Sequence, residues 1–202
     1  SGIDKDTAYT AAGVTSSVNT IKSNGIPADT SSTNVALTTG TDFKTLTASN
    51  DTINASGATL GSDDVITDIG GTDTLKVSVS STTATSTILN STGVEVIQVT
   101  NTGSADQTFE LTSATGVTTL SSYLSTGNIV FNDVQANAKV ILDNQSGTFT
   151  AEFANPVVVG SEDVANIEIK NNASASVLNI GDTDDEFETI NIAVGAGDRK
   201  SV

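Results

Sequence analysis

The sequence predicts an all-β protein whose strands wind into a parallel β-solenoid (a β-helix). Two observations point to this class. Short clusters of Val, Ile and Leu recur with a period near 23 residues, with two or three strand-length segments in each period. Aspartates in turn-like, Gly- and Ser-containing segments recur at nine residues, from Asp42 to Asp51 and again from Asp64 to Asp73, with thirteen residues between the two pairs. Periods of about 20 to 50 residues are typical of repeat folds in which stacked coils share one core.

Composition narrows the classes of function. The 202 residues carry 24 acidic and 8 basic side chains, a net charge of −16, which disfavours nucleic acid and anionic membranes as partners. No apolar run is long enough to cross a bilayer, so we expect no membrane insertion. The chain has no Cys and no His, which excludes disulfides, thiol chemistry and Ser-His-Asp catalysis. Its sole Arg is Arg199 and its lysines do not cluster in sequence, so we expect no enzyme activity.

The first 35 residues differ from the rest, and we expect a helix and a linker from an upstream domain. Apolar residues between positions 4 and 23 fall near helical spacing, and Gly25 with Pro27 would end such a helix. Residues 26–34 have the composition of a linker. Because the chain starts at Ser1 without a leader, we expect a fragment of a longer protein. The β-solenoid is expected over residues 36–202.

Within the solenoid, one apolar position per period is expected to stack on one face of consecutive parallel strands. These positions are Leu75, Ile97, Leu120, Ile141 or Leu142, Ile167 and Ile190, on strands expected at 71–79, 93–101, 116–124, 137–144, 164–171 and 187–194. Second strands are expected between them, at 86–91, 107–113, 128–133, 148–153 and 176–181. The alternative is an antiparallel sandwich, which also has regularly spaced turns but predicts no common register.

The nine-residue spacing has a chemical interpretation. Glycines allow a tight turn with positive φ, the Asp supplies carboxylate oxygen, and the apolar residue two positions later enters the core. Ca²⁺ takes about six to eight hard oxygen ligands, which two stacked turns can provide together. The simpler interpretation is that Asp and Gly merely form turns.

The segment NDTINASGATLGSDDVITDIGGTDTLKVSV (50–79) resembles RTX-type surface-layer (S-layer) proteins of Gram-negative bacteria and related secreted RTX adhesins. The resemblance spans about residues 36–195 and implies RTX-like turns with calcium as the cofactor. It places the carboxylate role on Asp51, Asp64 and Asp73, with Asp63 and Asp68 beside them. The acidic run GDTDDEFE (181–188) resembles a second calcium turn and adds Asp182, Asp184 and Asp185. The full Gly-Gly-x-Gly pattern is missing, so we expect one or a few ions and no long row.

The same resemblance implies a function. It implies a secreted, extracellular structural segment of a calcium-dependent cell-surface lattice. Its partners would be copies of itself as lattice neighbours, and cell-surface polysaccharide through other parts of the full protein. The alternative is a calcium-dependent adhesin module that binds sugar, ice or a host surface. A flat Thr-x-Thr array would indicate that alternative, and Thr45-Leu46-Thr47 and Thr72-Asp73-Thr74 are the candidate segments.

Overall fold

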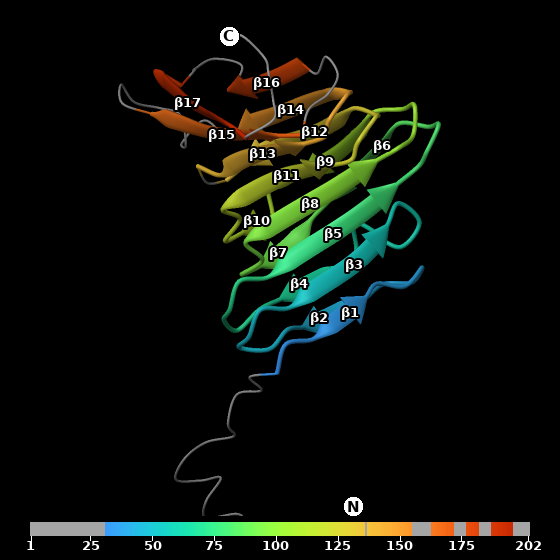
Figure 1. Ribbon diagram of the computed structural model, residues 1–202. Coiled ribbons are helices and arrows are strands. Elements are labelled where there is room, and N and C mark those ends of the chain that lie inside the picture. The colour runs from blue at the N-terminus through green and yellow to red at the C-terminus, as the bar shows by residue number, and fades with distance from the viewer. Residues whose placement is uncertain (1–30, 136, 155–162, 172–176, 182–186, 196–202) are drawn as a thin grey trace, which may run out of the picture. The chain divides into compact units, whose positions relative to one another are not determined.

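A computed structural model describes residues 31–135, 137–154, 163–171, 177–181 and 187–195 (Figure 1). These residues contain strands and turns and no helix. They belong to one compact unit, Ser31–Val202, and the remaining unit is Ser1–Thr30. The helix predicted over residues 4–23 and most of the predicted linker lie outside the described residues. The first strand begins at Asn34, so the solenoid starts close to the predicted boundary at residue 36.

The strands are short and follow one another through tight corners. The first nine are β1 (Asn34–Ala36), β2 (Phe43–Thr45), β3 (Thr52–Ser56), β4 (Val65–Thr67), β5 (Thr74–Val79), β6 (Thr85–Ile88), β7 (Asn90–Thr92), β8 (Val96–Asn101) and β9 (Gln107–Glu110). The others are β10 (Ala114–Thr115), β11 (Thr119–Tyr123), β12 (Ile129–Val134), β13 (Lys139–Asp143), β14 (Thr148–Phe153), β15 (Val164–Lys170), β16 (Val177–Gly181) and β17 (Thr189–Val194).

These strands form three sheets, and every strand pair in them is parallel. Sheet A has the order β1-β3-β5-β8-β11-β13-β15-β17, sheet B the order β10-β7-β4-β2, and sheet C the order β16-β14-β12-β9-β6. Neighbours in each sheet come from successive coils, as Figure 1 shows for the long run of sheet A strands. The predicted parallel β-solenoid is confirmed, and the antiparallel sandwich is excluded.

The cross-section changes along the solenoid. The first two coils alternate between sheets A and B (β1–β2 and β3–β4). The next two visit all three sheets (β5–β6–β7 and β8–β9–β10), and the later coils run between sheets A and C. Sheet B therefore ends where sheet C has been established, and the acidic nine-residue corners belong to the A/B part.

The core column of sheet A differs from the predicted one at two positions. Ile53, Leu75, Ile97 and Leu120 pair in register and are fully buried, as predicted for the last three. The residue that pairs with Leu120 is Val140, whereas Ile141 pairs with Ser121 and Leu142 with Ser122.

The second correction concerns the last coil. Ile167 pairs with Ile192, whereas Ile190 pairs with Ala165 and is 52% exposed. The prediction that Ile190 is buried in the column is wrong. Corner lengths vary between coils, so the column advances by unequal steps, and no described strand of sheet A covers β17.

Aromatic rings of sheet C and of the last coil fill the core of the second half of the solenoid. Phe109, Phe131 and Phe149 are buried and their ring centroids lie 5.5 and 5.6 Å apart in sequence order. Phe153 and Phe187 form an edge-to-face pair at 5.0 Å. Such pairs contribute about 0.5–1.5 kcal/mol each beyond the area they bury.

Candidate metal centre at the corner between sheets B and A

Four aspartates share one structural position. Asp42 lies directly before β2, Asp51 before β3, Asp64 before β4 and Asp73 before β5, and all four side chains are buried. One aspartate therefore stands at each corner of the first two coils, where the chain enters a sheet. The nine-residue spacing is the length of one strand plus one corner.

In the first two corners, a threonine four residues earlier closes the turn on the carboxylate. Thr38 donates its N–H and its hydroxyl to Oδ2 of Asp42 at 2.6 and 3.0 Å. Thr47 donates the same two groups to Oδ2 of Asp51 at 2.6 and 2.9 Å. These aspartates act as turn formers, which satisfies backbone groups that the corner would otherwise leave unpaired.

The two later aspartates, Asp64 and Asp73, each use one carboxylate oxygen to link consecutive coils. The N–H of Asp42 donates to Oδ1 of Asp64 at 2.8 Å, and the N–H of Asp51 donates to Oδ1 of Asp73 at 2.7 Å. Asp64 also accepts the N–H of Gly61 at 2.8 Å through Oδ2. Asp64 is thereby satisfied at both oxygens, as Asp42 and Asp51 are.

The pKa values reflect these partners. The Lys44 ammonium, 2.8 Å from Oδ1 of Asp42, and the Thr38 N–H hold the pKa of Asp42 below its ordinary value. Burial raises the pKa of Asp51, but the N–H groups of Thr47 and Thr33 outweigh that effect and lower it. Both groups are stabilised as carboxylates.

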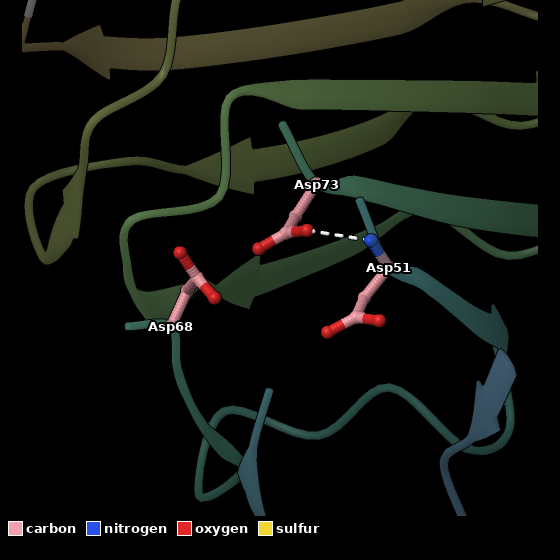
Figure 2. A group of neighbouring side chains, drawn as sticks. All are labelled: Asp51, Asp68 and Asp73. Atoms are coloured by element: carbon pink, nitrogen blue, oxygen red, sulfur yellow. Dashed lines mark hydrogen bonds between the residues drawn. The ribbon is translucent and has the colours of Figure 1, made fainter. Parts of the chain in front are cut away.

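Asp73 lacks such compensation. Its side chain is 0% exposed, its Oδ1 accepts the Asp51 N–H, and its Oδ2 is buried without a hydrogen-bond partner. Asp68, which directly follows β4, has the same deficit: Oδ2 accepts the Gly70 N–H at 2.6 Å, and Oδ1 is buried without a partner. Figure 2 shows one oxygen of Asp73 bonded to the Asp51 N–H and the other directed toward the Asp68 carboxylate. One oxygen from each of the three lies within 4.8 Å of the others.

The register of sheet B explains why Asp68 points into the corner. Thr45, Thr67 and Thr92 pair in successive coils, so Asp68 follows the strand end as buried Leu46 does in the coil before and Gly93 in the coil after. Gly93 has φ +82°, and a Cβ there would lie 3.0 Å from Cβ and 3.3 Å from Oδ2 of Asp68. Glycine at 93 therefore provides the space that the Asp68 side chain occupies.

Three carboxylates this close repel one another. At 4.8 Å and an effective dielectric constant of about 20, each charged pair costs about 3 kcal/mol. Burial raises the pKa of Asp73 to about 6, with the Asp68 and Asp51 carboxylates adding to the shift and the Asp51 N–H opposing it. None of the ion pairs among the described residues involves this cluster. The cluster therefore requires either a bound proton or a bound cation.

The donor set fits a hard divalent cation such as calcium. Calcium binds carboxylate oxygens at about 2.3–2.6 Å and accepts water for the remaining positions. Two buried oxygens without partners, on Asp68 and Asp73, are available without breaking a hydrogen bond, and Asp51 lies beside them.

The predicted ligands separate into three groups. The structure brings Asp51, Asp68 and Asp73 together. It places Asp64 at the opposite corner, between sheets A and B, with both oxygens satisfied, and Asp63 on an exposed turn beside it. Asp182, Asp184 and Asp185 lie outside the described residues.

Sequence reasoning missed two residues of this corner. Glu95 accepts the Asp73 N–H through Oε2 at 2.7 Å and continues the column that Asp51 and Asp73 begin. Gly93 makes room for Asp68. Extending the 22-residue step from Asp51 to Asp73 would have indicated Glu95. Gly93 requires aligning Thr67-Asp68 with Thr92-Gly93, a step of 25 residues that departs from that spacing. A glutamate that accepts the N–H of an aspartate in the preceding coil recurs near the last described strand, where the Asp163 N–H donates to Oε2 of Glu188 at 2.8 Å.

Fold and corner together define the class of this protein: a parallel β-solenoid with a buried carboxylate cluster where sheet B passes into sheet A. Comparison with known proteins gave no family model that matches the chain, and neither a curated protein nor a solved structure with significant similarity. In the part of the chain that the structure describes, no helix has the length and apolar character to cross a membrane.

Proposed function

We propose that this chain is a structural segment of a secreted, calcium-dependent surface layer, in which copies of the protein assemble into a lattice on the cell. The observation that carries the proposal is the pair of buried, partnerless carboxylate oxygens on Asp68 and Asp73 in a fold made of stacked coils. The resemblance of residues 50–79 to RTX-type surface-layer proteins supports the same function. Attachment to cell-surface polysaccharide is assigned to other parts of the full protein.

The chain's own residues have mechanical roles in this proposal. Asp51 closes its corner through Thr47 and receives the Thr33 N–H from the preceding coil. Asp73 holds the Asp51 N–H, and Glu95 holds the Asp73 N–H, so each coil is registered on the next. Asp51, Asp68 and Asp73 would hold a calcium ion, whose positive charge would allow all three carboxylates to stay ionised at this largely buried corner. No catalytic role is assigned to the chain.

Calcium also offsets a charge that opposes assembly. Copies that each carry a net charge of −16 repel one another over distances set by the ionic strength. Bound cations reduce that repulsion. We therefore expect association of copies to increase with calcium.

One observation favours the adhesin alternative. Thr45, Thr67, Thr92 and Thr115 pair in register on sheet B, and the hydroxyls of Thr45 and Thr67 lie 3.3 Å apart. Phe43, on the same strand as Thr45, is 76% exposed. A threonine column beside an exposed aromatic ring suits contact with a flat, repetitive surface. Of the predicted Thr-x-Thr pairs, Thr47 is buried and caps Asp51, so the array runs across coils instead of along one strand.

Two measurements test the proposal. Isothermal titration calorimetry of the full chain with calcium should give binding that Asp73→Asn weakens at least about tenfold, the loss of roughly 1.4 kcal/mol. Light scattering should then reveal association that grows between EGTA and about 5 mM calcium, the weak end of extracellular calcium modules. A chain that binds calcium but stays monomeric at high concentration contradicts the lattice role. Loss of glycan or ice-surface binding in Thr92→Lys, with calcium affinity retained, would favour the adhesin instead.

A further inference from the structure

The first coil of the solenoid, residues 31–50, has the properties of a detachable cap. Its strands β1 and β2 have three residues each, and its buried apolar side chains are Leu37 and Leu46. Lys44 stands in the core column at the position that buried Ile66 takes in the next coil, and it pairs with Asp42 at 2.8 Å. An inward-facing charge on a short terminal strand is a recognised way to close the open end of a sheet.

The bonds that hold this coil to its neighbour pass through the carboxylate cluster. Oδ1 of Asp51 accepts the N–H of Thr33, and Oδ1 of Asp73 accepts the N–H of Asp51. Asp51 thus anchors the first coil directly, also accepting the Thr47 N–H, and Asp73 holds Asp51 in place from the coil that follows. The ladder bonds that accompany them include Leu37 N–H to the Asn54 carbonyl at 3.0 Å and Leu46 N–H to the Thr67 carbonyl at 2.8 Å.

We propose that the cation at Asp51, Asp68 and Asp73 is a latch that holds residues 31–50 on the solenoid. With the cation bound, the charges of the anchors are balanced and the cap stays closed. Without it, the repulsion falls on Asp51, the anchor of a terminal coil with only two buried apolar side chains, and on Asp73, which holds Asp51, so the first coil opens first. This inference rests on the proposed function, since it assumes that the cluster binds calcium.

Opening would change what this end of the solenoid presents. Ile53 and Ile66, now buried under the first coil, would become the terminal apolar row, and the edges of β3 and β4 would lose their partners. Such an edge pairs readily with a second chain. Calcium would therefore control whether the segment ends in a closed cap or in a free sheet edge.

Hydrogen exchange with mass spectrometry on the full chain tests the latch, with calcium itself as the probe. In EGTA at pH 7, the amides of Leu37 and Leu46 should exchange at least about tenfold faster than in about 5 mM calcium, because local opening is set by the local free energy. Amides of Leu120 and Leu142, in β11 and β13, should change less than about twofold.

A charge-neutral variant sharpens the test. Asp68→Asn keeps the size of the side chain, removes one charge and offers an amide N–H toward the free oxygen of Asp73. Its first coil should be as protected in EGTA as the unmodified chain is in calcium, and calcium should have no further effect. Asp106→Asn, on the exposed far corner, is the matched control and should retain the full calcium response.

The outcomes separate the latch from the site. Faster exchange confined to residues 31–50 in EGTA, abolished by Asp68→Asn, supports the latch. If calcium binds in the calorimeter but changes the protection of all strands equally, or changes the protection of no strand, the latch is overturned and the calcium site is retained. An absence of calcium binding in the calorimeter overturns both.

Discussion

The backbone N–H of Asp51 donates to Oδ1 of Asp73 at 2.7 Å, from one coil to the next, and leaves Oδ2 of Asp73 buried with no partner. One carboxylate thus does two different things. Its first oxygen registers the coils, as the carboxylate of Asp64 does for Asp42 at the opposite corner. Its second oxygen has a function only when a proton or a cation reaches it.

This difference predicts unequal effects of two similar substitutions. Calcium that binds the folded chain alone should stabilise it by about 2.7 kcal/mol at 100 times its dissociation constant. Asp73→Ala should remove most of the calcium-dependent rise in melting temperature, measured by calorimetry between EGTA and calcium. Asp64→Ala is the matched control, because Asp64 has the same registering role and no free oxygen. It should lower the melting temperature equally in both buffers. A reduced calcium response in Asp64→Ala would show that the ion binds at the Asp64 corner and not at the Asp73 corner.

The pKa of Asp73 predicts how stability depends on pH without calcium. The folded-state pKa of about 6 lies above the ordinary 3.8, so between these pH values the folded chain binds more protons than the unfolded chain. Its contribution therefore favours folding at low pH and is lost as pH rises from about 4 to 6, by about 3 kcal/mol in all.

Urea unfolding of the unmodified chain and of Asp73→Asn in EGTA measures this contribution. The stability difference between the two should change by that amount across the window and be flat above about pH 7. Other carboxylates, such as Asp51 with its lowered pKa, act in the opposite direction below about pH 4 and cancel in the difference. A difference that does not vary with pH would mean that Asp73 is ionised normally in the folded chain.

The core column predicts a contrast between two isoleucines. Ile167 is buried between Val140 and Ile192, so Ile167→Asp places an unpaired charge in the core, costs several kcal/mol and should unfold the domain. Ile190→Asp, on the exposed last strand, should cost about 1 kcal/mol or less. Circular dichroism of both variants makes the comparison, and equal loss of β-signal would mean that a further layer covers β17.

The backbone conformation of Leu124 predicts a substitution that raises the stability of the fold. Leu124, Asn144 and Asn171 follow strands of sheet A with φ values of 49°, 54° and 49°, a conformation that costs Leu more than Asn. Leu124 is also 45% exposed, so little packing is lost on replacement. Leu124→Asn should stabilise the fold by about 1 kcal/mol, and Asn144→Leu should destabilise it by a similar amount. Thermal unfolding in one calcium buffer checks both, and a lower melting temperature for Leu124→Asn would contradict the argument.

The sequence alone determined the parallel solenoid, most of its core column and the residue types of its corners. Period and apolar spacing are local properties, and each coil repeats them because it must bury the same row of side chains. They identified Leu75, Ile97 and Leu120 as partners and indicated an aspartate at each corner. The pattern failed at Val140 and Ile192, where coil length changes and register is set by the neighbouring coil.

Only the tertiary structure separated the aspartates. In sequence Asp51, Asp64 and Asp73 look alike, since each precedes a strand and follows a turn. Whether a carboxylate is satisfied depends on backbone N–H groups from the adjacent coil and on the space that the adjacent coil leaves. Asp64 finds both its donors, whereas Asp68 and Asp73 meet across the room left by Gly93 with one oxygen each unpaired. The decisive contacts, Asp42 with Asp64, Asp51 with Asp73 and Asp68 with Gly93, join residues 22 to 25 positions apart, so the stacking of coils, and not the local pattern, decides which acids form the site.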